Sequence, residues 1–144
     1  MATKLKQYAD TIRVTADELD EVTATSEDIL EYGIEQMDSN LLTSSLSISA
    51  SVATMVWAFT KKKNFALGLV GLVLGFQPSL RDQLADHVRK ANRELHSIRR
   101  FMKRNPDYIQ VEIEAPFMDF DGGRVITGEG VVHRVKTRSG WITL

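Results

Sequence analysis

The chain has 144 residues, of which 43% are hydrophobic and 26% are charged, and it contains no cysteine. This length suits one domain or two small lobes, and the ordinary composition argues against disorder throughout. The lack of cysteine excludes disulfides, thiolate metal sites and cysteine nucleophiles.

Charge is divided unevenly along the chain, although the net charge is only −1. Residues 1–40 carry three Lys or Arg and ten Asp or Glu, whereas residues 61–104 carry eleven and three. The acidic and basic segments can attract each other, either within one protomer or between neighbours. Alternatively, the basic segment binds an anionic partner such as lipid headgroups or nucleic acid.

The first segment, residues 3–38, has apolar side chains at alternating steps of four and three, which predicts one long amphipathic helix with an acidic outer face. We expect a solvated surface helix. The alternative is a coiled coil, which the small residues in the seam disfavour. The acidic start of the chain also differs from a signal peptide, which opens with a basic region.

Residues 39–60 form the first apolar segment, a run of 22 residues without a formal charge. As a helix the run would span about 33 Å, enough for the hydrocarbon core of a membrane. Four of its hydroxyl residues would form one stripe on that helix: Ser44, Ser47, Ser51 and Thr54. Such a stripe permits close helix packing in lipid or lines a wet pore. The alternative is a buried helix in a soluble bundle.

Residues 64–77 form the second apolar segment, which is marginal in length for a membrane crossing. The residues between the two segments are Lys61, Lys62 and Lys63. The glycines of the second segment are Gly68, Gly71 and Gly75. Glycine weakens a helix in water but is tolerated in a membrane, where a GxxxG spacing lets helices approach closely. We therefore expect these glycines and the hydroxyl stripe to bring helices together in a homo-oligomer.

Residues 80–104 hold apolar side chains at a heptad-like spacing, which predicts an amphipathic helix that ends at Asn105 and Pro106. Its outer face is basic. The residues expected to contact an anionic partner are Lys61, Lys62, Lys63, Arg89, Lys90, Arg93, Arg99 and Arg100. Only Asn92 and Phe101 lie among them to read or stack a base, so nucleic acid is not the favoured partner.

The last part of the chain, residues 105–144, alternates with period two between Gly-rich turns. The pattern predicts a small antiparallel β-meander of three or four strands, whose apolar face covers a helix or whose edge pairs with a neighbouring subunit. The expected fold is therefore α+β. A helical region over residues 1–104, with a central apolar helical hairpin, precedes the β-meander.

No motif predicts chemistry. His87, His96 and His133 have no local spacing that suggests catalysis or metal binding. The segment from Asp119 to Gly123 resembles the start of a calcium loop but lacks the later ligands, so we expect a hairpin turn. We expect no enzyme activity, no catalytic or metal site, no cofactor and no small-molecule substrate.

The favoured hypothesis is a non-enzymatic, self-associating membrane protein that forms a helical oligomer or pore. Two membrane crossings would conflict with the positive-inside rule, and the conflict vanishes if only residues 39–60 cross. The first alternative is a soluble structural subunit of a large particle, such as a virion or an injection machine, which buries the apolar helices between subunits. The second alternative is nucleic-acid binding through the basic helix 80–104.

Overall fold

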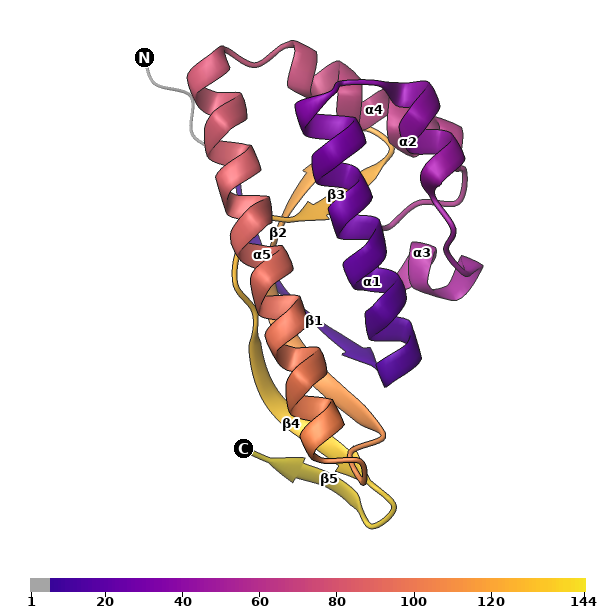
Figure 1. Ribbon diagram of the computed structural model, residues 1–144, viewed down its shortest axis with the longest axis vertical. Helices are drawn as coiled ribbons and strands as arrows, with labels where there is room; N and C mark the ends of the chain where they lie inside the picture. Colours follow the sequence, from indigo (N-terminus) through magenta and orange to yellow (C-terminus); the bar gives the residue numbers. More distant parts are fainter. Residues whose placement is uncertain (1–5) are drawn as a thin grey trace.

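The computed structural model describes residues 6–144, which form a mixed α+β fold in which helices pack against an antiparallel sheet (Figure 1). The first element is strand β1, Tyr8–Val14, and it pairs along its whole length with strand β2, Gln110–Phe120. Ile12 and Val14 are buried while Arg13 is exposed, as a half-buried strand requires. The prediction of one helix over residues 3–38 is therefore wrong for this part of the chain.

The first helix begins where the sequence provides a cap. Thr15 accepts a hydrogen bond from the backbone of Glu18, and the Glu18 side chain accepts one from the backbone of Thr15. Helix α1, Ala16–Asp28, follows and continues as the π-helix η1, Ile29–Glu35. The expected helix is thus present from residue 16 to residue 35.

The first apolar segment does not form the predicted helix of 22 residues. It is divided into helix α2, Ser39–Ser45, and helix α3, Ala50–Val56. Asp38 caps the first of these helices and Ser49 caps the second. Asp38 and Ser49 thus mark the starts of two short helices and not positions in or beside one long helix. Their side chains accept hydrogen bonds from the free N–H groups of the first helical turn.

The second apolar segment forms helix α4, Lys62–Leu74, which has 13 residues and is about 20 Å long. A membrane crossing needs about 20 apolar residues. Within residues 6–144, no helix has the length and apolar character that crossing a membrane requires. The prediction of a transmembrane helix is therefore wrong, and so is the classification as a membrane protein that rested on it; the structure gives the predicted membrane location no support.

The basic helix is confirmed as helix α5, Pro78–Arg104. Pro78 occupies the start of the helix, where its missing N–H has no cost, and Asn105 follows the last turn. The apolar positions of α5 are buried, including Leu84, Val88 and Leu95. Figure 1 shows α5 running beside α1 and η1 in front of the sheet.

The remaining strands follow the prediction closely. They are β2, β3 (Gly123–Ile126), β4 (Val131–Thr137) and β5 (Gly140–Thr143). The strand order differs from a simple meander in two ways. Both β3 and β4 pair with β2, and the N-terminal strand β1 joins the sheet, which gives the order β1-β2-β4-β5. One buried cluster takes residues from the helices and the strands. The division into regions 1–104 and 105–144 stays a prediction.

Candidate functional site

A charged groove lies between α1 with η1 on one side and α5 on the other. Its volume is about 770 Å³ and it is open to solvent. The lining residues are Glu27, Leu30, Glu31, Glu35, Asp86, Arg89, Lys90, Asn92, Arg93 and His96. The acidic and basic segments of the chain therefore meet within one protomer.

Ion pairs join α1 and η1 to α5, both within the groove and beyond its lining residues. Arg89 Nη2 lies 3.1 Å from Glu35 Oε1, and Arg99 Nε lies 2.8 Å from Asp20 Oδ1. Arg99 is 24% exposed and the other three partners are about half exposed, so each pair stabilises the fold by about 0–1 kcal/mol. Beneath the groove, Ser26 donates a hydrogen bond to the buried Asn92 Oδ1. The pairing within one protomer, one of two alternatives from the sequence, is confirmed.

The residues expected to contact an anionic partner are brought together only in part. Arg89, Lys90 and Arg93 line the groove, whereas Arg99 reaches Asp20 and Arg100 donates to Ser97. A phosphate would have to compete with the carboxylates that already contact Arg89 and Arg99. The groove therefore offers an anionic partner fewer free cations than the sequence suggests.

The triple lysine lies at the start of α4. Lys61 is the residue before the helix, and Lys63 is exposed in the first turn. Lys62 Nζ donates to the carbonyl oxygen of Leu46 at 2.6 Å, which ties α4 to the loop between α2 and α3. At least one of these lysines thus contributes to the fold of the protomer.

Helix α4 is apolar on the side that the protomer covers and on the side that it does not. Phe65, Leu69 and Val73 are fully buried. On the opposite side, Leu67 is 50% exposed and Leu74 is 64% exposed. These two leucines are one heptad apart and lie on the same side of the helix. We call Leu67, Gly71 and Leu74 the α4 face.

The three glycines of α4 occupy different environments. A Cβ on Gly68 would lie 1.7 Å from the carbonyl oxygen of Asp121, so this glycine lets the helix pack against the turn between β2 and β3. A Cβ on Gly71 would meet nothing within 4 Å. Gly75 is exposed just after the helix. Gly68 therefore serves packing inside the protomer, whereas Gly71 lies open on the α4 face.

The predicted hydroxyl stripe is not assembled. Ser44 lies in α2, Ser47 in the following loop, and Ser51 and Thr54 in α3. Ser44 and Thr54 donate to carbonyl oxygens of their own helices. Residues that lie on two helices and a loop cannot form one helical stripe.

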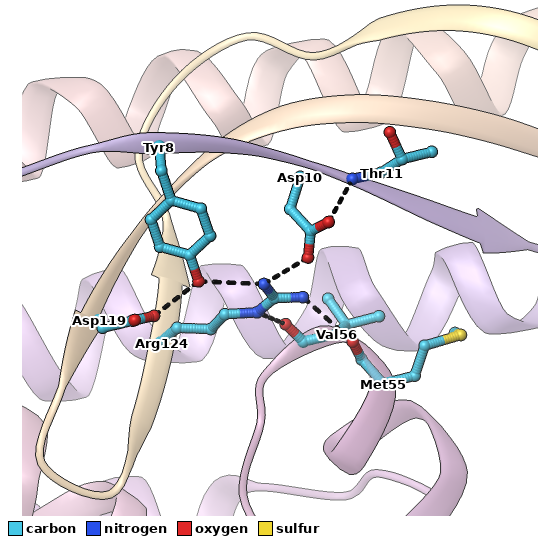
Figure 2. Close-up of polar contacts among 7 residues, drawn as sticks. All are labelled: Tyr8, Asp10, Thr11, Met55, Val56, Asp119 and Arg124. Atoms are coloured by element: carbon cyan, nitrogen blue, oxygen red, sulfur yellow. Dashed lines mark hydrogen bonds and ion pairs between the residues drawn. The ribbon is translucent and has the colours of Figure 1, made fainter.

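Sequence reasoning missed the buried guanidinium of Arg124, at the start of β3 (Figure 2). Its Nε donates to the carbonyl oxygen of Val56 at 2.7 Å, and its Nη2 donates to that of Met55 at 3.1 Å. Its Nη1 lies 2.7 Å from Asp10 Oδ2 and 3.1 Å from the hydroxyl of Tyr8. Arg124 thus holds the carbonyl end of α3 against β1 and β3.

The electrostatics around Arg124 are those of a structural cluster. The hydrogen bond from Arg124 lowers the pKa of Asp10. Partial burial and the hydrogen bond that Tyr8 donates to Asp119 raise the pKa of Tyr8. An activated tyrosine would need a lowered pKa, so these contacts favour support of the fold over nucleophilic chemistry. The only signal in the sequence was a charged residue opening a strand whose next residues are Val125 and Ile126.

A second polar cluster lies on the face of the sheet that points away from the core. Glu112 of β2 receives hydrogen bonds from Arg13 of β1 and Arg134 of β4. These contacts, chiefly that with Arg134, lower the pKa of Glu112 to about 2. Both arginines also lie over the ring of Trp141 in β5. The cluster therefore links four neighbouring strands.

The histidines lie apart from one another. His87 Nδ1 is 3.1 Å from the carbonyl oxygen of Thr127, His96 contacts Glu27 and His133 contacts Glu114. Among residues 6–144, no group of three or more His, Asp or Glu side chains has the arrangement to hold a metal ion. The segment around Gly122 forms the expected hairpin turn, with a positive φ of 113° at this glycine.

Comparison with protein-family models, with curated proteins and with solved structures finds no match to this chain.

Proposed function

We propose that this protein is a structural subunit that associates with further copies of itself and buries the α4 face between subunits. The observation that carries the proposal is that α4, from Phe65 to Leu74, is apolar around its circumference but is covered on one side only. A helix with apolar residues on all sides is usually a buried helix. A second copy is the simplest cover for the open side.

The size of the expected gain supports this proposal. Leu67 and Leu74 are each at least half exposed, so covering them contributes about 1–2 kcal/mol per side chain. The exposed Gly71 between them costs the helix about 1 kcal/mol relative to alanine. Because Gly71 has no side chain, the backbone of another subunit could approach α4 closely at this point.

The charged groove supports the other hypotheses less well. Nucleic-acid binding through α5 would draw on Arg89 and Arg99, and both already contact carboxylates of the acidic segment. The α4 face has no comparable partner among the described residues. Association through apolar contact therefore fits the arrangement better than phosphate binding.

The test is the mass of the protein in solution by size-exclusion chromatography with light scattering. We expect the wild type to exceed the 16.2 kDa of one protomer. Replacing both leucines, Leu67→Ser with Leu74→Ser, should reduce that mass. Met55→Ser is the matched control, since Met55 is an exposed apolar residue of α3. Equal masses for the wild type and the double variant would contradict the proposal.

A further inference from the structure

Strand β5 is the last strand of the sheet, and among the described residues it pairs with β4 alone. Its residues Trp141, Ile142 and Thr143 carry no charge. Edge strands are usually protected from pairing by Lys, Pro, a bulge or a covering element. The β4–β5 pairing is regular, and Figure 1 shows the hairpin reaching past the end of α5. This edge is therefore open to another strand.

We infer that β5 pairs in antiparallel fashion with β5 of a second copy, so that one sheet continues through two protomers. The inference goes beyond the proposed function and does not depend on the α4 face. It predicts a two-fold axis at the edge of the sheet, because antiparallel pairing of identical strands is symmetric.

The hydrogen bonds to β4 restrict the register of this pairing, because they decide which residues of β5 have free backbone groups. Ile142 is opposite Val135, Gly140 is opposite Thr137, and the N–H of Leu144 donates to the carbonyl oxygen of His133. The alternate residues of β5 then point their backbone groups away from β4. These residues are Trp141 and Thr143. If Trp141 of each copy bonds Thr143 of the other, residues 140–144 of both copies are paired along their whole length. This register places Ile142 directly opposite Ile142 of the second copy.

Apolar side chains on one side of β5 support the pairing. Ile142 is 47% exposed and Leu144 is 61% exposed, and alternation places both on the same side of the strand. Across the two-fold axis each Ile142 would gain an apolar neighbour at the distance of a cross-strand pair. Exposed apolar surface at a free strand edge is thus covered by the same contact that pairs the backbone.

Charge at the two ends of the edge favours a second copy in this orientation. Lys136 and Arg138 lie at the hairpin end of β5, while Glu129 lies beside Leu144 at its other end. Antiparallel pairing brings the basic end of one copy to the acidic end of the other. A parallel arrangement would bring like charges together.

The strand is also held in place before it pairs. The ring of Trp141 lies under cations of three residues on β1 and β4, with centroid distances of 5.2 Å from Arg13, 5.0 Å from Arg134 and 6.0 Å from Lys136. A rigid edge loses less conformational entropy when another strand joins it.

The test uses single cysteines, because the chain has none of its own. In Ile142→Cys, the two cysteines would face each other across the axis with Cα atoms about 4.5–5.5 Å apart, within reach of a disulfide. In the matched control Leu144→Cys, the two cysteines would be offset by four residues, about 13 Å along the strands. Under mild oxidation we expect a covalent dimer for Ile142→Cys, formed at least tenfold faster than for Leu144→Cys.

A second pair of variants tests the backbone contact. Thr143→Pro removes an N–H that points away from β4, and Thr143→Val keeps it. With Ile142→Cys also present, proline should slow cross-linking at least tenfold and valine should not. Cross-linking should persist with Leu67→Ser and Leu74→Ser, which separates this inference from the proposed function. Absent cross-linking of Ile142→Cys, or equal rates at residues 142 and 144, would overturn the inference.

Discussion

The charged groove and the α4 face differ in how their side chains are satisfied. In the groove Arg89 of the basic helix reaches Glu35 of the acidic segment, and beside it Arg99 reaches Asp20. On the α4 face, Leu67 and Leu74 remain exposed around an open glycine. The segments whose charge suggested an external partner are thus paired within the protomer, and the apolar helix is left uncovered.

Charged side chains were paired within the protomer and apolar area was left uncovered, so charge along the sequence is the weaker guide to which surface stays free. Exposed ion pairs contribute little because water solvates both partners well, so they mark neither a strong core nor a strong interface. Apolar surface gains free energy whenever it leaves water.

The largest effect is expected from Arg124, which fixes α3 beneath the sheet. Arg124→Leu removes both hydrogen bonds to the carbonyl groups of Met55 and Val56 and leaves Asp10 without its cation. We expect a loss of about 2–4 kcal/mol in the free energy of unfolding, because two carbonyl groups lose their donor. Asp10 adds little to this loss, since its side chain is 47% exposed and water can solvate it. Urea unfolding measures the loss, with Asp10→Asn as the milder control. A loss below about 1 kcal/mol would mean that the cluster does not hold α3.

The next effect is expected from Gly68, the glycine that faces inward. Gly68→Ala places a methyl group against the carbonyl oxygen of Asp121, so α4 must shift away from the hairpin turn. We expect a destabilisation of about 1–3 kcal/mol, typical of overpacking. Thermal or urea unfolding of a dilute sample measures it. An unchanged stability would contradict the close packing at this position.

Gly71 provides the matched opposite result. Gly71→Ala meets nothing within 4 Å, so the protomer should gain about 1 kcal/mol from the better helix former. The same variant should weaken self-association if a second backbone approaches there. Unfolding measures the first effect and light scattering the second. A variant that is stabilised and assembles like the wild type would restrict the proposed contact to the two leucines.

A small effect is expected in the groove. A double-mutant cycle with Arg99→Ala and Asp20→Ala should give a coupling of about 0.2–1 kcal/mol, since both side chains reach solvent. Salt should reduce this coupling. A coupling above about 2 kcal/mol would mean that this ion pair contributes substantially to holding α1 against α5.

The last effect depends on pH and concerns Glu112. Its pKa falls from an ordinary value of 4.5 to about 2 in the fold, so its stabilising contribution is complete above about pH 4.5 and is lost as the pH falls toward 2. Glu112→Gln should therefore lower the melting temperature at pH 7, and the difference from the wild type should shrink between pH 4.5 and pH 2. A difference that stays constant with pH would contradict the link to ionisation.

The parts of the fold that the sequence predicted are those with a single clear period. Helix α5 and strands β2 to β5 have unambiguous spacing and turn residues, and they were found. Strand β1 was missed because Ile12 fits two patterns. It alternates with Val14 as in a strand, but it also fits the helical spacing of the apolar residues around it, and the helical pattern was followed. The break in residues 39–60 was missed because serine, which favours a helix cap, also packs within helices in lipid, and the length of the uncharged run favoured the second interpretation.

The sites were predictable only in outline. The division of charge allowed pairing within the chain, but the partner of Arg99 depends on how α1 lies against α5. Gly68 and Gly71 look alike in the sequence, and only the position of the β2–β3 turn distinguishes them. Arg124 binds carbonyl groups of residues 68 and 69 positions earlier, which no local pattern reveals.

The most direct test of the central claim is the accessibility of the α4 face in the assembled protein. A single cysteine at Leu67→Cys would be labelled with a maleimide in dilute and in concentrated solution, with Lys103→Cys at the end of α5 as the control. We predict that labelling at residue 67 slows at least tenfold as the concentration rises, while labelling at residue 103 keeps its rate. Equal rates at residue 67 at all concentrations would contradict the claim that further copies cover α4.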